Sequence, residues 1–241
     1  MMWLAILALG LIAGTIGGIV GFGSSIILLP VLFFVFGPIE AVPIMAIAGL
    51  MANLSRVAVW WREVDWRAGA AFSATAAPAA ALGAFTLVSI NARLVEIALG
   101  VFFIAMIPIR RWLLAKGWTI GLGQLALAGL LIGYLSGIVA SVGPINTPMF
   151  LAYGLVKGAY LSTEALGSAA MGLAKGIVFR RYDAMPLETV IRGLIIGSSV
   201  MAGSRIAKHF VLQLEPERFR LLMDGLLFVA GLVMLAGAWF G

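Results

Sequence analysis

Long apolar runs separated by short polar stretches follow one another along almost the whole chain. About 20 apolar residues cross the hydrocarbon core of a bilayer as a helix. Two of the runs, 25–36 and 147–156, are too short to cross alone. The pattern predicts an all-α polytopic membrane protein with apolar segments at roughly 3–20, 25–36, 40–61, 67–89, 92–110, 118–139, 147–156, 160–179, 187–207 and 219–240.

The composition supports a membrane environment and excludes several other classes of protein. Of the 241 residues, 63% are hydrophobic and 11% are charged, whereas a soluble domain carries about 25% charged residues. The net charge of +6 comes from cations that lie mainly between the apolar runs, so we expect lipid and not nucleic acid as the partner. The chain has no cysteine and one histidine, His209, which we expect on the surface. We therefore expect no metal, no cofactor and no enzymatic activity.

Each short apolar segment follows a stretch of glycine, serine or proline, and these two stretches are related. The first is Gly21-Phe22-Gly23-Ser24-Ser25, and the second is residues 140–147. The spacing between corresponding residues is constant (148 − 30 = 118), as in the pairs Pro30 and Pro148, Ser25 and Gly143, Arg62 and Arg180, and Asp65 and Asp183. The spacing predicts two homologous repeats, 1–112 and 113–241, that form one transport domain.

The loop charges predict how the two repeats are oriented. With five segments in each repeat, the repeats are inverted, and loop cations divide ten against four between the two sides. The larger group marks the cytoplasmic side, which places both termini outside. The division of the loop cations is the same whether each short segment crosses the membrane or forms a re-entrant hairpin with the preceding helix, because a hairpin also returns to the side on which it starts. The larger group is Arg62, Arg67, Arg110, Arg111, Lys116, Lys157, Arg205, Lys208, Arg218 and Arg220, and the smaller is Arg93, Arg180, Arg181 and Arg192.

A helix that begins inside the membrane directs free N–H groups and its positive dipole end at a cavity, which suits an anion. Paired interrupted helices in inverted repeats indicate a transport site. The alternative is that the polar residues only cap the interrupted helices. The candidate substrate-binding residues at the two interruptions are Gly21, Gly23, Ser24, Ser25, Ser141, Gly143, Asn146 and Thr147.

Charged residues inside the apolar segments are further candidates, because such residues default to a functional role. Arg56 and Lys175 occupy nearly equivalent repeat positions, and Asn53 precedes Arg56 by one helical turn. We expect these three residues to bind an anionic head group. The alternative is that both cations extend to the membrane surface.

The remaining charged residues give weaker predictions. Glu96, Glu164 and Asp224 either carry a coupling proton or pair with a neighbouring arginine, as Asp224 could with Arg220. We expect Arg62 with Asp65, and Arg180 with Asp183, to brace loops. Small residues along the helices, such as Gly69, Gly193 and Gly197, should allow close helix packing.

The sequence from Gly18 to Pro30 resembles the glycine-rich signature of the TauE/SafE sulfite exporter family. Residues 143–148 resemble the second copy of that signature. The resemblance implies secondary transport, by export or uptake, of a small sulfur-containing anion such as sulfite, sulfoacetate or another organosulfonate, in a bacterial inner membrane, and of the two directions we expect export. The chain departs from the signature at Ser24-Ser25, which replace two glycines, and at residues 140–142. An anion channel, a non-sulfur organic anion and a homodimer stay open as alternatives.

Overall fold

The computed structural model describes residues 2–88, 92–115, 117–139, 142–182 and 185–209, together with Gly225, Phe228, Val229, Leu232 and two residues at 235 and 236. Nearly all of this part of the chain is helical. The predicted segment 219–240 falls almost wholly outside the described residues. The α-helices are α1 (Met2–Val20), α2 (Gly23–Phe36), α3 (Pro38–Val59), α4 (Trp66–Val88), α5 (Ala92–Ala115), α6 (Leu122–Val139), α7 (Gly143–Ala152), α8 (Lys157–Arg181) and α9 (Leu187–Ile206), with short 3-10 helices η1 (Trp61–Glu63) and η2 (Ala207–His209).

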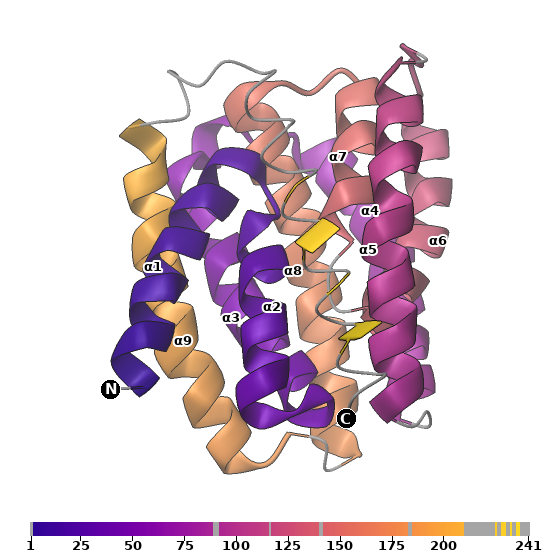
Figure 1. The fold of residues 1–241 in the computed structure, drawn as a ribbon. Coiled ribbons are helices and arrows are strands. Elements are labelled where there is room, and N and C mark those ends of the chain that lie inside the picture. Colours follow the sequence, from indigo (N-terminus) through magenta and orange to yellow (C-terminus); the bar gives the residue numbers. More distant parts are fainter. Residues whose placement is uncertain are drawn as a thin grey trace.

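The helices form a bundle in which α3 and α8 cross at the centre. Figure 1 shows α1 and α9 side by side at one edge of the bundle, with α4, α5 and α6 at the other edge. Arg56 lies beside Glu164, whereas Leu50 lies beside Gly172, so α3 and α8 are antiparallel. The centre of the bundle therefore consists of one helix from each predicted repeat.

The outer helices divide into two sets of opposite direction. Gly14 faces Val200 and Gly18 faces Ser204, so contacts advance together along α1 and α9 and these helices are parallel. The same comparison makes α3 parallel to α9, and α4 parallel to both α6 and α8. Helices α1, α3 and α9 thus run one way, and α4, α6 and α8 run the other way.

Two glycine stripes allow the outer helices to touch backbone to backbone. The stripes are Gly10, Gly14 and Gly18 on α1, and Gly129, Gly133 and Gly137 on α6. A Cβ atom on Gly14 would lie 2.2 Å from the carbonyl oxygen of Val200, and one on Gly133 would lie 2.2 Å from that of Ala76. No side chain fits at either contact. The predicted close packing at Gly69, Gly193 and Gly197 is confirmed, since a Cβ there would meet side-chain atoms at 2.4–2.7 Å.

Both interruptions predicted from the sequence are present, although the second lies earlier than expected. Gly21 has a φ of 102°, a conformation that favours glycine, and it separates α1 from α2. Helix α7 begins at Gly143 and not near residue 147, because Pro144 lies in its first turn, where the missing N–H costs nothing. The irregular stretch predicted for 140–147 is therefore too long.

Four helices of the described chain are long and apolar enough to cross a membrane: α1, α3 from Glu40, α4 and α9 together with η2. Helix α8 is longer than all four, but it carries buried polar residues that lower its hydropathy, including Ser162, Thr163, Glu164 and Lys175. These side chains face other helices, so α8 is shielded from lipid along that side.

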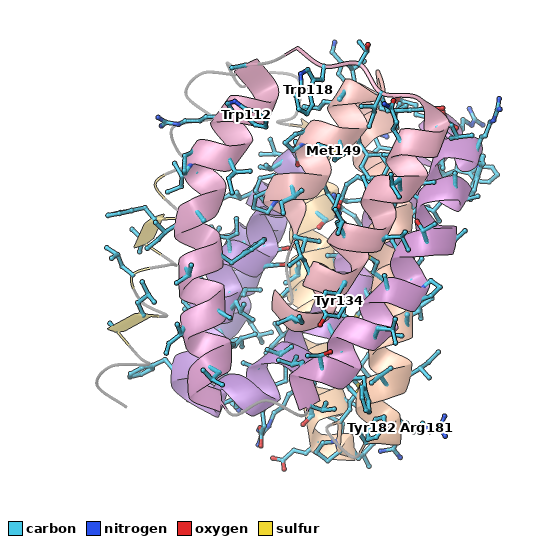
Figure 2. All side chains as sticks on the ribbon, turned by 90° about the vertical axis from the view of Figure 1, so that its right-hand side faces the viewer. Trp112, Trp118, Tyr134, Met149, Arg181 and Tyr182 are labelled. Atoms are coloured by element: carbon cyan, nitrogen blue, oxygen red, sulfur yellow. The ribbon has the colours of Figure 1, made fainter. Side chains whose placement is uncertain are left out.

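Aromatic side chains lie at both ends of the bundle. Figure 2 shows Trp112 and Trp118 at one end and Arg181 and Tyr182 at the other. The two tryptophan rings contact each other edge to face at 5.3 Å between centroids, and all three aromatic side chains are about half exposed. Tryptophan and tyrosine concentrate at the two surfaces of a bilayer, so this placement fits helices that span a membrane.

Candidate functional site

A polar cavity lies where the two interrupted helices meet the crossing of α3 and α8. It has a volume of about 60 Å³ and lies between these four elements and the end of α6. Its wall includes both cations that the sequence places inside apolar segments. The lining residues are Gly21, Phe22, Ser24, Ser25, Met45, Ala46, Gly49, Leu50, Asn53, Arg56, Ser136, Val142, Gly143, Glu164, Ser168, Met171, Gly172 and Lys175.

The starts of α2 and α7 both open onto this cavity. No side chain caps either helix, since Phe22 and Val142 occupy the N-cap positions. The two interruptions also touch, because a Cβ atom on Gly143 would lie 1.8 Å from the Cβ of Phe22. Uncapped N–H groups at a helix start favour an anion. The cavity therefore receives two positive helix ends at one point.

Tyr160 of α8 ties the two interruptions together. Its hydroxyl donates a hydrogen bond to the carbonyl oxygen of Val20 at 3.0 Å, at the end of α1. The same hydroxyl shares a hydrogen bond of 2.6 Å with Thr147 of α7. A single side chain thus holds a residue from each predicted repeat next to the cavity.

Arg56 forms a buried ion pair with Glu164. Its Nη1 lies 2.8 Å from the carboxylate Oε2, and the two side chains are 5% and 2% exposed. The other guanidinium nitrogen donates to the Oδ1 of Asn53. The opposite carboxylate oxygen of Glu164 accepts hydrogen bonds from Ser168 at 2.6 Å and from Asn146 at 3.1 Å. The pair is thus held by polar groups from three helices.

Lys175 lies at the other end of the cavity and has a different environment. Its Nζ donates to the carbonyl oxygen and the hydroxyl of Ser136, at 3.1 and 3.0 Å. Both Lys175 and Arg56 are buried inside the protein. The alternative that these cations extend to the membrane surface is therefore wrong.

The structure brings most of the candidate residues together. Gly23 packs against Ile16, and Asn146 and Thr147 lie inside α7, so these three do not line the cavity, while Ser141 lies outside the described residues. The alternative that polar residues only cap the interrupted helices is wrong, because neither helix has a side-chain cap. The candidates that line the cavity are Gly21, Ser24, Ser25, Asn53, Arg56, Gly143 and Lys175.

The sequence did not single out several residues of the site. Ser168 follows Glu164 by four residues and so shares its helix face, a spacing that is visible in the sequence. Ser136 lies one turn before the second interruption. Of the two alternatives for Glu164, the structure shows the pairing with an arginine, although that partner is 108 residues away.

The other charged candidates lie away from the cavity. Asp65 caps α4 by accepting a hydrogen bond from the N–H of Ala68 at 2.9 Å, and Arg180 donates to the carbonyl oxygen of Met185 at 3.2 Å. Arg180 thus contacts the loop that follows α8, and the pairing of Arg62 with Asp65 stays a prediction. His209 is exposed, as predicted. The partner Asp183, the side chain of Glu96, and the predicted pair Arg220 and Asp224 lie outside the described residues.

A second, apolar cavity adjoins the first. It has a volume of about 500 Å³ between α3, the second half of α8 and the start of α9, and it shares Ala46, Leu50 and Gly172 with the polar cavity. Arg180 and Arg181 lie on its wall at the end of α8. The three shared residues thus have the polar cavity on one side and this larger space on the other.

The model of the sulfite exporter TauE/SafE family matches residues 6–234, almost the whole chain. No curated protein and no solved structure matches it. The match covers both interrupted helices and every described residue that lines the polar cavity. The chain belongs to the sulfite exporter TauE/SafE family.

Proposed function

We propose that this chain is a secondary transporter that exports a small sulfur-containing anion, sulfite or an organosulfonate such as sulfoacetate, by alternating access. Its family is a family of membrane transporters and not of enzymes. The observation that carries the proposal is the polar cavity, in which Arg56 and Lys175 face two uncapped helix starts. Two cations and one carboxylate line it, so the lining has a net charge of +1.

The chemistry of the cavity suits an oxyanion. A sulfite or sulfonate group presents three acceptor oxygens, and it needs several donors arranged around it. The N–H groups at the start of α2, the N–H of Gly143 at the start of α7, the hydroxyls of Ser24 and Ser25, and the ammonium of Lys175 supply such donors. Ser24 and Ser25 stand where the family signature has glycines. Their hydroxyl groups add hydrogen-bond donors, which favour an oxyanion over a halide.

The packing of the helices supports two inverted repeats. Exchanging α1 with α6, α3 with α8 and α4 with α9 maps each helix onto one of opposite direction. The exchange also preserves the main contacts, since α9 packs against α1 and α3 in the same way that α4 packs against α6 and α8. Such a relation favours alternating access, in which the two repeats move around a fixed central site.

The two ends of the bundle differ in how tightly they are closed. At the end that holds η1, a Cβ atom on Gly158 would lie 2.4 Å from the Glu63 carboxylate and 2.5 Å from the Trp60 ring. At the other end, the apolar cavity lies next to the polar cavity and shares three lining residues with it. This difference favours a conformation that is closed at the η1 end.

The loop cations favour an orientation in which the η1 end faces the cytoplasm of an inner-membrane protein. Arg62, Arg67, Lys157, Arg205 and Lys208 lie in or beside the loops at this end. The N-terminus of α1 lies at the opposite end (Figure 1), which fits a chain that begins outside.

A thermal-shift screen of detergent-purified protein tests the substrate class. The screen compares sulfite, sulfoacetate and methanesulfonate with sulfate, acetate and chloride. A ligand at a hundredfold excess over its Kd stabilises the folded state by about 2.7 kcal/mol. We expect a selective shift with sulfite or a sulfonate. A shift with acetate or chloride but with no sulfur oxyanion would contradict the proposal.

A further inference from the structure

We infer that Glu164 is the proton-binding group of the transport cycle, and that each anion which occupies Arg56 moves together with one proton. The inference rests on the proposed function and identifies the coupling ion of the same site. It follows from three features of the described residues: the ion pair with Arg56, the donors around Glu164, and the unsatisfied oxygen of Asn146.

Arg56 is already neutralised before any substrate enters. Its Nη1 binds Glu164 and its Nη2 binds Asn53, so each terminal nitrogen of the guanidinium already has an acceptor. A sulfonate that binds Arg56 must therefore displace the carboxylate or lie against it. Two anions beside one guanidinium repel each other, and the repulsion falls when one of them takes up a proton.

Glu164 is the anion that can take up this proton, because a sulfonate is the anion of a strong acid. Its side chain is 2% exposed. A carboxylate that loses its cationic partner at such a site is costly unless it becomes neutral. Proton uptake by the displaced Glu164 leaves the charge of the site unchanged, since the anion brings one negative charge and the proton removes one.

Asn146 is placed to serve both forms of Glu164. Its amide nitrogen now donates to the carboxylate Oε1 at 3.1 Å. Its own Oδ1 is buried and has no hydrogen-bond partner among the described residues. Rotation of the amide by half a turn would present Oδ1 to Glu164, where it can accept a hydrogen bond from a protonated carboxyl. Ser168, whose hydroxyl can donate or accept, fits either form.

No other charged group of the surrounding helices competes for this role. Arg56 and Lys175 are the charged side chains that line the cavity with Glu164. On η1 and α4, which also pack against α8, Arg62, Glu63 and Arg67 are exposed. Asp65, between η1 and α4, is half-buried and its carboxylate caps α4 at Ala68, while Glu40 of α3 pairs with Arg192. Helix α7 has no ionisable side chain, and the only one on α6 is Tyr134, which bonds to Thr86. The remaining charges of α8 itself, Lys157, Arg180 and Arg181, lie at its two ends.

The coupling has a consequence for the direction of transport. A monovalent sulfonate that moves with one proton carries no net charge, so the pH difference and the anion gradient set the direction, and the membrane potential does not. Export proceeds when the anion gradient exceeds the opposing pH difference. When the outside is acidic and the anion is abundant there, the same cycle gives uptake.

Proton uptake during binding tests the inference directly. Methanesulfonate is added to purified wild-type protein in weakly buffered detergent solution with a pH-sensitive dye, and binding is measured in parallel by calorimetry. We expect about one proton to be taken up per anion bound. Over the pH range in which binding takes up this proton, the Kd should rise by up to tenfold per pH unit. In difference infrared spectra, we expect a protonated-carboxyl band to appear on binding.

The variant Glu164→Gln tests whether Glu164 is the group that takes up the proton. It keeps the shape of the side chain but cannot titrate, so we expect binding to persist or tighten, with no proton uptake and no pH dependence. A purely structural role predicts weaker binding instead. The exposed Glu188, which pairs with Arg192 at the surface, provides the control Glu188→Gln, which should behave as wild type. If Glu164→Gln does not fold, the infrared band of the wild type decides.

The outcomes separate the two proposals. Methanesulfonate binding without proton uptake and without a carboxyl band would overturn the coupling and leave the proposed function standing. Proton uptake that persists in Glu164→Gln would also overturn the assignment to Glu164. Failure of the wild type to bind methanesulfonate, sulfite and sulfoacetate would overturn the proposed function, and the coupling with it.

Discussion

Removing one partner of the Arg56–Glu164 pair should destabilise the protein far more than removing both. The two side chains are almost fully buried and their charged atoms are 2.8 Å apart. A buried charge left without its partner costs about 3–5 kcal/mol, whereas replacing a whole pair by neutral groups is often close to neutral. We therefore expect Arg56→Gln and Glu164→Gln each to lower the free energy of unfolding by about 3–5 kcal/mol.

The double variant Arg56→Gln/Glu164→Gln closes the comparison. It should lie within about 1 kcal/mol of wild type, because two amides can hydrogen-bond to each other and no buried charge remains. The sum of the single effects would be about 6–10 kcal/mol, so the coupling free energy should be at least about 5 kcal/mol. Unfolding by SDS in mixed micelles, at pH 7 and without substrate, measures all four proteins. Additive single effects, or singles within about 1 kcal/mol of wild type, would refute the reasoning.

Three further predictions follow from individual contacts. Gly133→Ala should destabilise the protein by about 1–3 kcal/mol in thermal unfolding, because its Cβ would lie 2.2 Å from a backbone oxygen of α4. The control Gly123→Ala in the same helix meets nothing within 4 Å, so it should be neutral or stabilising in that assay. Lys175→Gln should weaken sulfonate binding in calorimetry by about tenfold or more, since a charged hydrogen bond contributes about 1.5–3 kcal/mol, and an unchanged Kd would show that Lys175 does not contact the anion. Tyr160→Phe removes hydrogen bonds to Val20 and Thr147 but keeps the ring, so it should alter the transport rate in liposomes more than the Kd, and equal effects on both would contradict a role in holding the interruptions together.

The order of the helices could be predicted from the sequence because it depends on local patterns. Apolar runs and glycine-rich interruptions located all nine described α-helices to within a few residues. The predicted start of the short segment at residue 147 is wrong, because Pro144 can occupy the first turn of a helix and α7 begins at Gly143. The packing stripes on α1 and α6 are visible in the sequence as glycines spaced four residues apart.

The contacts inside the site could be predicted only in part, because they depend on how distant helices cross. The repeat spacing related Arg56 to Lys175 and predicted that both bind one anionic head group. It could not show that Glu164 neutralises Arg56 while Lys175 binds Ser136, since Glu164 has no acidic counterpart in the first repeat and the antiparallel crossing of α3 and α8 sets its partner. Capping by Ser24, Ser25, Asn146 and Thr147 was wrong for a similar reason: in both helices the N-cap residue is apolar and the helix start opens onto a cavity.

Counterflow in proteoliposomes tests the central claim most directly, namely that the polar cavity carries a sulfur oxyanion by alternating access. Vesicles loaded with unlabelled sulfite are diluted into a trace of radiolabelled sulfite, and uptake is followed for the wild type and for Lys175→Gln. A carrier predicts saturable uptake that internal sulfite accelerates and that the variant reduces. Uptake that never saturates and does not depend on internal sulfite would indicate a channel, and no uptake above that of empty vesicles would contradict the account.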